Sequence, residues 1–141
     1  MNTLVHQKWL IGIVPTVITV ILTFALYKVG TKLLIGQHQK NVILLLKEWE
    51  QQFEDVASER EAFDAIDMYE YASKYYVAGE GYFSSEKMSL RLEDQRRQTL
   101  DTIVSSLEKF TGLQYGHDFE KWKEWRDDVL AKNKATQNPQ S

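Results

Sequence analysis

Residues 9–27 read WLIGIVPTVITVILTFALY and contain no charged side chain. A helix over this stretch is about 29 Å long at 1.5 Å per residue, close to the roughly 30 Å hydrocarbon core of a bilayer. Trp9 and Tyr27 stand at its two ends, where aromatic rings favour the headgroup layer, and Lys28 follows with a side chain that can reach outward to water. The stretch therefore predicts a transmembrane helix, which we bound at residues 9–29.

Two other interpretations of this stretch fit it less well. A cleaved signal peptide has an apolar region of about 7 to 15 residues followed by a small-residue cleavage site, whereas this stretch is longer and is followed by no such site. A helix buried in a soluble core would need cover on every side, which a chain this small cannot give. We therefore expect an uncleaved anchor, bent slightly at Pro15 because proline removes one helical hydrogen bond.

Charges beside the predicted span bear on its orientation. Lys28, Lys32 and Lys40 follow the span, while Lys8 and the amino terminus precede it in a short tail, residues 1–8. An excess of Lys and Arg marks the cytoplasmic side of a membrane. We therefore expect the C-terminal part of the chain to lie in the cytoplasm.

The chain beyond the span is acidic. From residue 37 onward, 14 Lys and Arg stand against 20 Asp and Glu, so this part carries about −6 while the whole chain carries −3. A nucleic-acid partner needs a basic surface that neutralises phosphates, and we expect none. The absence of cysteine excludes disulfides, thiolate metal sites and cysteine nucleophiles.

Helical periodicity runs through this part, and no alternation of period two competes with it. Residues 30–47 form a predicted juxtamembrane segment, which is a helix near the membrane surface, an outward continuation of the span, or core at its leucine run. An acidic helical domain is expected over 48–131, followed by a disordered tail at 132–141. The predicted fold class is all-α, with a single N-terminal transmembrane helix followed by a small helical bundle or helical hairpin.

Capping residues bound the expected helices of the domain. Ser84 or Ser85 is an expected N-cap for a helix over 86–110, and Asp118 for a short last helix. Glycines mark the expected helix ends, at 79 and 81 after the first helix and at 112 after the second.

Residues 107–125 read LEKFTGLQYGHDFEKWKEW. This segment resembles the closing segment of bacterial HEAT-repeat proteins, where a Thr-Gly pair ends a helix, an aromatic-Gly turn follows, and an aspartate opens a short helix with spaced tryptophans. The resemblance implies a bacterial helical interaction module, for which the inner membrane is the expected location. A second copy of the repeat period is not seen, and stacked repeats need about three units. The matching residues are Thr111-Gly112, Tyr115-Gly116, Asp118, Trp122 and Trp125.

No constellation of catalytic or metal-binding residues is recognisable. The carboxylates of residues 48–70 lack the Glu-x-x-His pairs of a di-iron bundle and the spacing of an EF-hand loop. We interpret them as a solvated face, with a docking surface for a basic partner as the alternative. His6, His38 and His117 have no partners in the sequence pattern that indicate catalysis. We expect no enzyme activity, no metal and no cofactor.

Aromatic side chains are the candidate partner contacts. Tyr71 and Tyr75 fall on a different helical face from Tyr69 and Tyr76, so one core cannot take all four. Exposed tyrosines favour interfaces because they add contact area at low entropic cost, although semi-exposed core is the alternative. The predicted contacts are Tyr71, Tyr75, Tyr82, Phe83, Trp122 and Trp125.

These features predict a membrane-anchored, non-enzymatic accessory, scaffold or assembly subunit of a larger membrane complex. Its expected partners are the lipid bilayer and other membrane protein subunits. The first alternative is a self-associating single-span structural protein, a homo-oligomer paired through residues 45–56. The second is a tethered small-ligand binder or enzyme whose site the sequence does not reveal.

Overall fold

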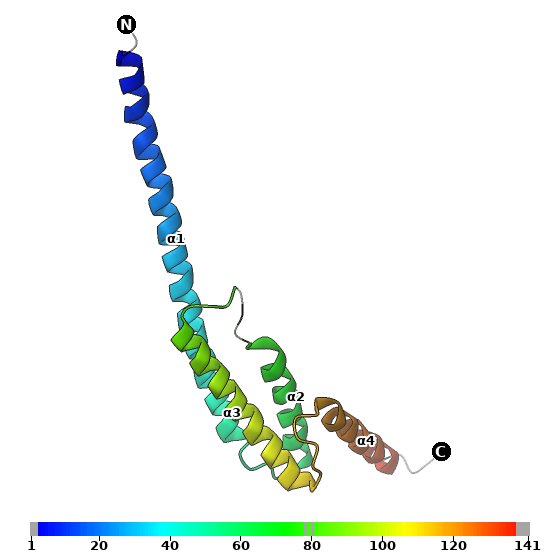
Figure 1. Ribbon diagram of the computed structural model, residues 1–141. Helices are drawn as coiled ribbons and strands as arrows, with labels where there is room; N and C mark the ends of the chain where they lie inside the picture. The colour runs from blue at the N-terminus through cyan, green and yellow to red at the C-terminus, as the bar shows by residue number, and fades with distance from the viewer. Residues whose placement is uncertain (1–2, 78, 80, 138–141) are drawn as a thin grey trace.

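The computed structural model describes residues 3–77, 79 and 81–137, with side chains from residue 14 to residue 136 except at 78 and 80. Four helices and no strand occur in this part of the chain, so the predicted all-α fold class is confirmed (Figure 1). The helices are α1 (Thr3–Gln52), α2 (Glu59–Tyr75), α3 (Glu86–Thr111) and α4 (Phe119–Gln137).

Helix α1 contains 50 residues, which makes it roughly 75 Å long. Its N-terminal half projects away from the other helices (Figure 1), and every side chain from residue 14 to residue 29 is exposed. From Val14 on, α1 is long and apolar enough to cross a membrane. Threonine hydroxyls in this half bond back to carbonyls one turn earlier, as from Thr19 to Pro15 and from Thr23 to Thr19 at 2.8 Å, which keeps their polarity inside the helix.

Helix α1 continues unbroken through Gly30 and Gly36, from the predicted span into the predicted juxtamembrane segment. Two of the three interpretations of residues 30–47 apply at once. The helix continues outward from the predicted span, and Val42 and Leu46 in its later part are buried in the core. A glycine inside a helix costs only about 1 kcal/mol relative to alanine. Packing of α3 along this part of α1 offsets that cost, so the helix does not end there.

The domain is built in the spatial order α1, α3, α2, α4. Helix α3 packs along the C-terminal half of α1, α2 packs on α3, and α4 packs on α2 (Figure 1). Buried polar groups tie α3 to α1 and to the segment that follows α1: the Thr99 hydroxyl donates to the carbonyl of Leu46 at 3.0 Å, and the Ser106 hydroxyl accepts from the N–H of Val56 at 2.8 Å. The buried apolar residues are Val42, Leu46, Phe53, Val56, Ala62, Ala65, Ile66, Tyr69, Ala72, Leu92, Leu100, Ile103, Val104, Leu107 and Trp122.

Most predicted helix ends are confirmed. Ser85 caps α3 by accepting from the N–H of Met88 at 3.3 Å, and Gly112 ends α3 in the left-handed region with φ of 74°. The carboxylate of Asp118 accepts from the N–H of Lys121 at 3.4 Å, as an N-cap of α4 does. Helix α2 ends at Tyr75, several residues before the glycines expected to stop it.

The prediction of a disordered tail from residue 132 differs from the structure, where α4 continues to Gln137. Two side-chain bonds support this extension: Thr136 donates to the carbonyl of Lys132 at 3.0 Å, and Asn133 donates to Glu59 of α2 at 3.0 Å. Alanine and lysine in this segment also favour helix. The last four residues of the predicted tail lie outside the described part of the chain.

Candidate functional site

The predicted membrane anchor is the exposed half of α1. Pro15 lies inside the helix and Tyr27 is exposed at the end of the uncharged stretch. The ammonium of Lys28 lies 4.9 Å from the centre of the Phe24 ring, a cation–π contact that leaves the charge in reach of water. The side chain of Trp9 lies outside the described residues. From residue 14 on, no part of the described chain covers this half of α1, and it is a candidate membrane span by its length and composition.

A second candidate surface is aromatic and lies where α2 meets α1. It consists of Trp49, Tyr71, Tyr75 and Tyr76, and we call it the aromatic surface. The ring of Tyr71 lies 5.9 Å from Trp49 and 4.8 Å from Tyr75, centre to centre. Tyr71 is 41% and Tyr75 67% exposed, so both remain candidate partner contacts. Burial, together with the neighbouring Tyr71 hydroxyl, raises the pKa of Tyr76 to about 12, which keeps this part of the surface uncharged.

Tyr82 and Phe83 belong to the segment that joins α2 to α3, and their side chains lie in different environments. The Tyr82 hydroxyl lies 2.6 Å from Nδ1 of His38 on α1, and burial raises the pKa of Tyr82. The backbone carbonyl of Tyr82 accepts from the buried amide of Gln39 at 2.9 Å. Tyr82 therefore ties its segment to α1, while Phe83 is 46% exposed and remains a candidate contact.

Trp122 and Trp125 also take different roles. Trp122 is 1% exposed, and its indole N–H donates to the carbonyl of Gly116 at 2.8 Å. Its ring meets Tyr115 edge-on, 4.9 Å between centres. Trp122 is therefore not available as a partner contact, because its side chain is buried in the core. Trp125 is half-buried against Phe63, with 5.9 Å between ring centres, and keeps only part of its ring for a partner.

The acidic residues of the domain are largely solvated, and several pair with cations. Asp67 pairs with Arg126 of α4 at 2.5 Å, and Asp55 pairs with Lys109 at 2.7 Å. The hydrogen bond from Lys109 lowers the pKa of Asp55. Among the described residues, no group of three His, Cys, Asp or Glu side chains is arranged to hold a metal ion.

One polar cluster was not predicted from the sequence. The His117 ring joins Tyr69 of α2 and Asp101 of α3, with 3.1 Å from Nδ1 to the Tyr69 hydroxyl and 3.0 Å from Nε2 to the carboxylate. Burial, and then the charge of Asp101, raises the pKa of Tyr69. The hydroxyl of Tyr69 is 48 residues from His117 in sequence, so no local pattern pointed to the contact. The cluster connects α2 and α3 to the segment before α4.

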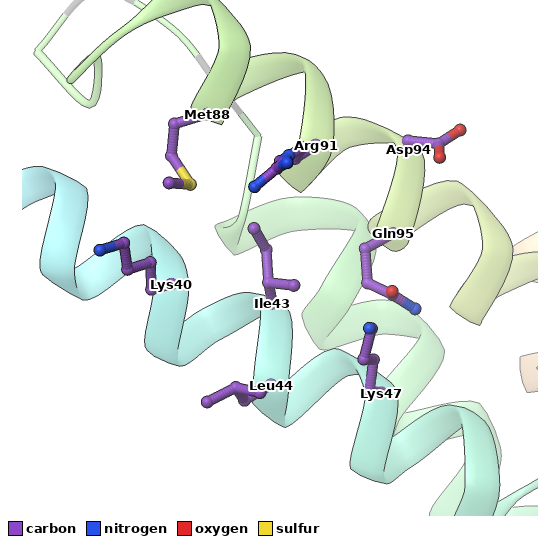
Figure 2. Close-up of a pocket in the computed structure, with 8 residues that line it drawn as sticks. All are labelled: Lys40, Ile43, Leu44, Lys47, Met88, Arg91, Asp94 and Gln95. Carbon is purple, nitrogen blue, oxygen red and sulfur yellow. The ribbon is translucent and has the colours of Figure 1, made fainter.

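Two hollows lie side by side between α1 and α3. The distal groove has a volume of about 530 Å³, and Figure 2 shows Ile43 and Arg91 pointing into the space between the helices. Its apolar lining is edged by Lys47 and Arg91, and its one carboxylate, Asp94, pairs with Arg97 at 2.8 Å. The residues that line the distal groove are Lys40, Ile43, Leu44, Lys47, Met88, Arg91, Asp94 and Gln95.

The proximal groove lies nearer to the exposed half of α1 and has a volume of about 510 Å³. It shares Lys40 and Met88 with the distal groove, so the two form one trough along the helices. The residues that line the proximal groove are Val29, Lys32, Leu33, Gly36, Gln37, Lys40, Ser84, Ser85 and Met88.

No family model, curated protein or solved structure matches this chain. Its function is therefore inferred from its own surfaces. These are an apolar half-helix that the described chain leaves uncovered, an aromatic surface on the domain, and a trough bordered by cations.

Proposed function

We propose that this protein is a membrane-anchored, non-enzymatic accessory, scaffold or assembly subunit of a larger membrane protein complex. It acts through protein–protein contacts from a cytoplasmic domain at a bacterial inner membrane. One observation carries the proposal: α1 is a single helix whose first half is exposed and apolar and whose second half is the core of the domain.

The exposed half of α1 supports insertion into lipid. Leu, Ile, Phe and Val at the centre of a span each favour insertion by about 0.3–0.6 kcal/mol. The described part of α1 exposes many such side chains between Val14 and Leu26, and none of this stretch is buried by the chain itself. In water the same surface would drive association or aggregation.

The charges that follow the apolar half support a cytoplasmic domain. Lys28, Lys32, Lys40 and Lys47 occur before the first carboxylate of the chain, Glu48. Lysines close to the end of a span favour the cytoplasmic side, and an anionic leaflet attracts them further.

The continuity of α1 also sets the distance between the end of the uncharged stretch and the aromatic surface. Trp49 of the aromatic surface lies 22 residues beyond Tyr27 in the same helix, which is about 33 Å along its axis. A rigid anchor holds Tyr71 and Tyr75 near this height and raises their effective concentration for a partner in the same membrane. The aromatic surface is therefore suited to the peripheral part of another membrane protein.

Self-association through residues 45–56 is less well supported. Leu46, Phe53 and Val56 on that segment are buried within the chain, so they are not free to pair with a second copy. Cross-linking in membranes distinguishes the two proposals: heterologous bands favour a complex with other subunits, and a homodimer ladder favours self-association.

Co-purification from membranes after mild detergent extraction tests the proposed function. The Tyr71→Ser/Tyr75→Ser double variant removes the exposed rings of the aromatic surface, and Leu130→Ser, at an exposed position of α4, is the control. Interface tyrosines contribute about 1–2 kcal/mol each, so affinity for the partner should fall roughly 30- to 700-fold in the double variant only. A lone, monodisperse wild-type protein with no recurring partner would contradict the proposal.

A further inference from the structure

We propose that the proximal groove binds the headgroup of an anionic phospholipid in the leaflet next to the domain. This inference rests on the proposed membrane anchoring and names one ligand class for the domain that the anchor carries. The carrying observation is that apolar residues and two lysines without carboxylate partners in the described chain line one groove next to the exposed half of α1.

Apolar and cationic residues alternate along the α1 side of the groove. Val29, Lys32 and Leu33 line the end nearer the span, and Gln37 and Lys40 line the end nearer the domain. A phospholipid offers both chemistries, with acyl chains for Val29 and Leu33 and a phosphate for the lysines. A peptide from the aqueous side would have to place its chain against Val29 at the membrane boundary, so a lipid suits this lining better.

The groove is held in shape by the chain itself. Gly36 lets the segment before α3 approach α1 closely, since a Cβ at this position would lie 3.3 Å from the Cβ of Ser84. The Ser84 hydroxyl donates to Oε1 of the buried Gln39 at 2.5 Å. Ser85, the next residue, caps α3. The part of the groove lined by Ser84 and Ser85 is therefore held by α1 on one side and by α3 on the other.

The cations of the groove are available to an anion. Lys32 and Lys40 are exposed, and within the described part of the chain neither forms an ion pair with a carboxylate. Lys74, Lys109 and Lys121, by contrast, each pair with one. No carboxylate occurs in the sequence from residue 28 to residue 47. The trough is thus a positive region on an otherwise acidic domain, and lysine ammonium groups bind phosphate oxygens strongly.

The position of the groove matches the headgroup layer. The apolar surface of α1 continues beyond Tyr27 through Leu33 and Leu34, which are 69% and 74% exposed. The uncharged run ends at Tyr27, whose ring favours the headgroup layer, and Lys32 lies five positions further, about 7.5 Å along the helix. Lys32 is therefore at the depth of the lipid phosphates, and Lys40, about 12 Å beyond it, continues the positive region toward the domain.

The test uses the full chain reconstituted in phosphatidylcholine vesicles with and without phosphatidylglycerol. Lipid retained on the protein after gentle detergent extraction is identified by native mass spectrometry, and vesicle flotation reports anchoring separately. The wild type should retain phosphatidylglycerol over phosphatidylcholine. Lysines near an anionic surface contribute about fivefold each, so Lys32→Gln/Lys40→Gln should lower that preference roughly 25-fold while floating normally.

Two control variants keep the result specific. Lys123→Gln/Lys132→Gln removes the same charge from exposed positions of α4 and should keep the preference, as should Lys32→Arg/Lys40→Arg, which retains the positive charge. Inorganic phosphate as competitor should not displace the lipid, because the acyl chain contributes to binding.

Each contrary outcome has one meaning. Normal flotation without a preference for phosphatidylglycerol, an equal loss in the α4 control, or displacement by inorganic phosphate would overturn the headgroup site and leave the anchor intact. Failure of the wild type to float with either vesicle would overturn the proposed function as well.

Discussion

The buried amide of Gln39 donates from Nε2 to the backbone carbonyl of Tyr82, 2.9 Å away. Its Oε1 accepts the hydroxyl of Ser84 at 2.5 Å, so both ends of the amide are used. The two bonds hold the segment between α2 and α3 against α1, on the side from which the exposed half of α1 leaves the domain (Figure 1). This amide therefore connects the anchor helix to the shape of the proximal groove.

Gln39→Leu should lower the free energy of unfolding of the domain by about 1–3 kcal/mol, because it leaves the carbonyl of Tyr82 and the hydroxyl of Ser84 without their partner. Thermal unfolding in detergent measures the loss, and amide hydrogen exchange should accelerate at residues 81–85. Gln37→Leu is the control: Gln37 is exposed two positions away and should change stability by less than about 0.5 kcal/mol. Equal effects of the two variants would show that the Gln39 amide does not hold this segment.

Leu22→Arg should lower membrane integration by roughly 100-fold, because an arginine at the centre of a span disfavours insertion by about 2.5–3.5 kcal/mol. Leu44→Arg is a matched control in the same helix, since Leu22 and Leu44 are 58% and 59% exposed. Only Leu44 lies on the domain half of α1. Carbonate extraction followed by flotation gives the integrated fraction. The boundary between the two halves of α1 would be misplaced if both variants behaved alike.

Trp122→Ala should destabilise the domain by about 3–5 kcal/mol, as truncation of a buried tryptophan does. It also removes the indole that donates to the carbonyl of Gly116. Trp125→Ala should have a smaller effect because its ring is only half-buried. Chemical denaturation of both variants followed by circular dichroism compares them, and a larger loss at Trp125 would contradict the core position of Trp122.

The start of α4 should loosen in acid. The side chain and then the N–H of Lys121 lower the pKa of Asp118, so this carboxylate is ionised more readily in the folded than in the unfolded chain. Its stabilisation is present above the unfolded pKa, about 4, and is lost as the pH falls through the lowered folded value. Amide exchange at residues 119–122, corrected for the intrinsic rate, should increase below about pH 4.

Asp118→Asn separates the charge from the cap. Asparagine still accepts the hydrogen bond of an N-cap but does not titrate, so the acid-dependent exchange at the start of α4 should disappear. Persistence of the same pH dependence in this variant would assign it to another group.

Local chemistry in the sequence was sufficient for the class of fold and for several helix ends. An uncharged run as long as a bilayer core predicted the apolar half-helix, and spacing of three and four predicted the others. Ser85, Gly112 and Asp118 were found from the sequence because a cap depends on backbone groups within three or four residues of it. These features need no knowledge of distant parts of the chain.

Only the tertiary structure placed the second half of α1 in the core, buried Trp122, and joined His117 to Tyr69 and Asp101. The two grooves likewise depend on residues of α1 and α3 that lie more than 40 positions apart in the sequence. Burial depends on which helices pack against a side chain, and the same periodic pattern is compatible with several packings. The sequence therefore determined which faces are apolar, and the packing of α3 on α1 determined which of them the chain covers itself.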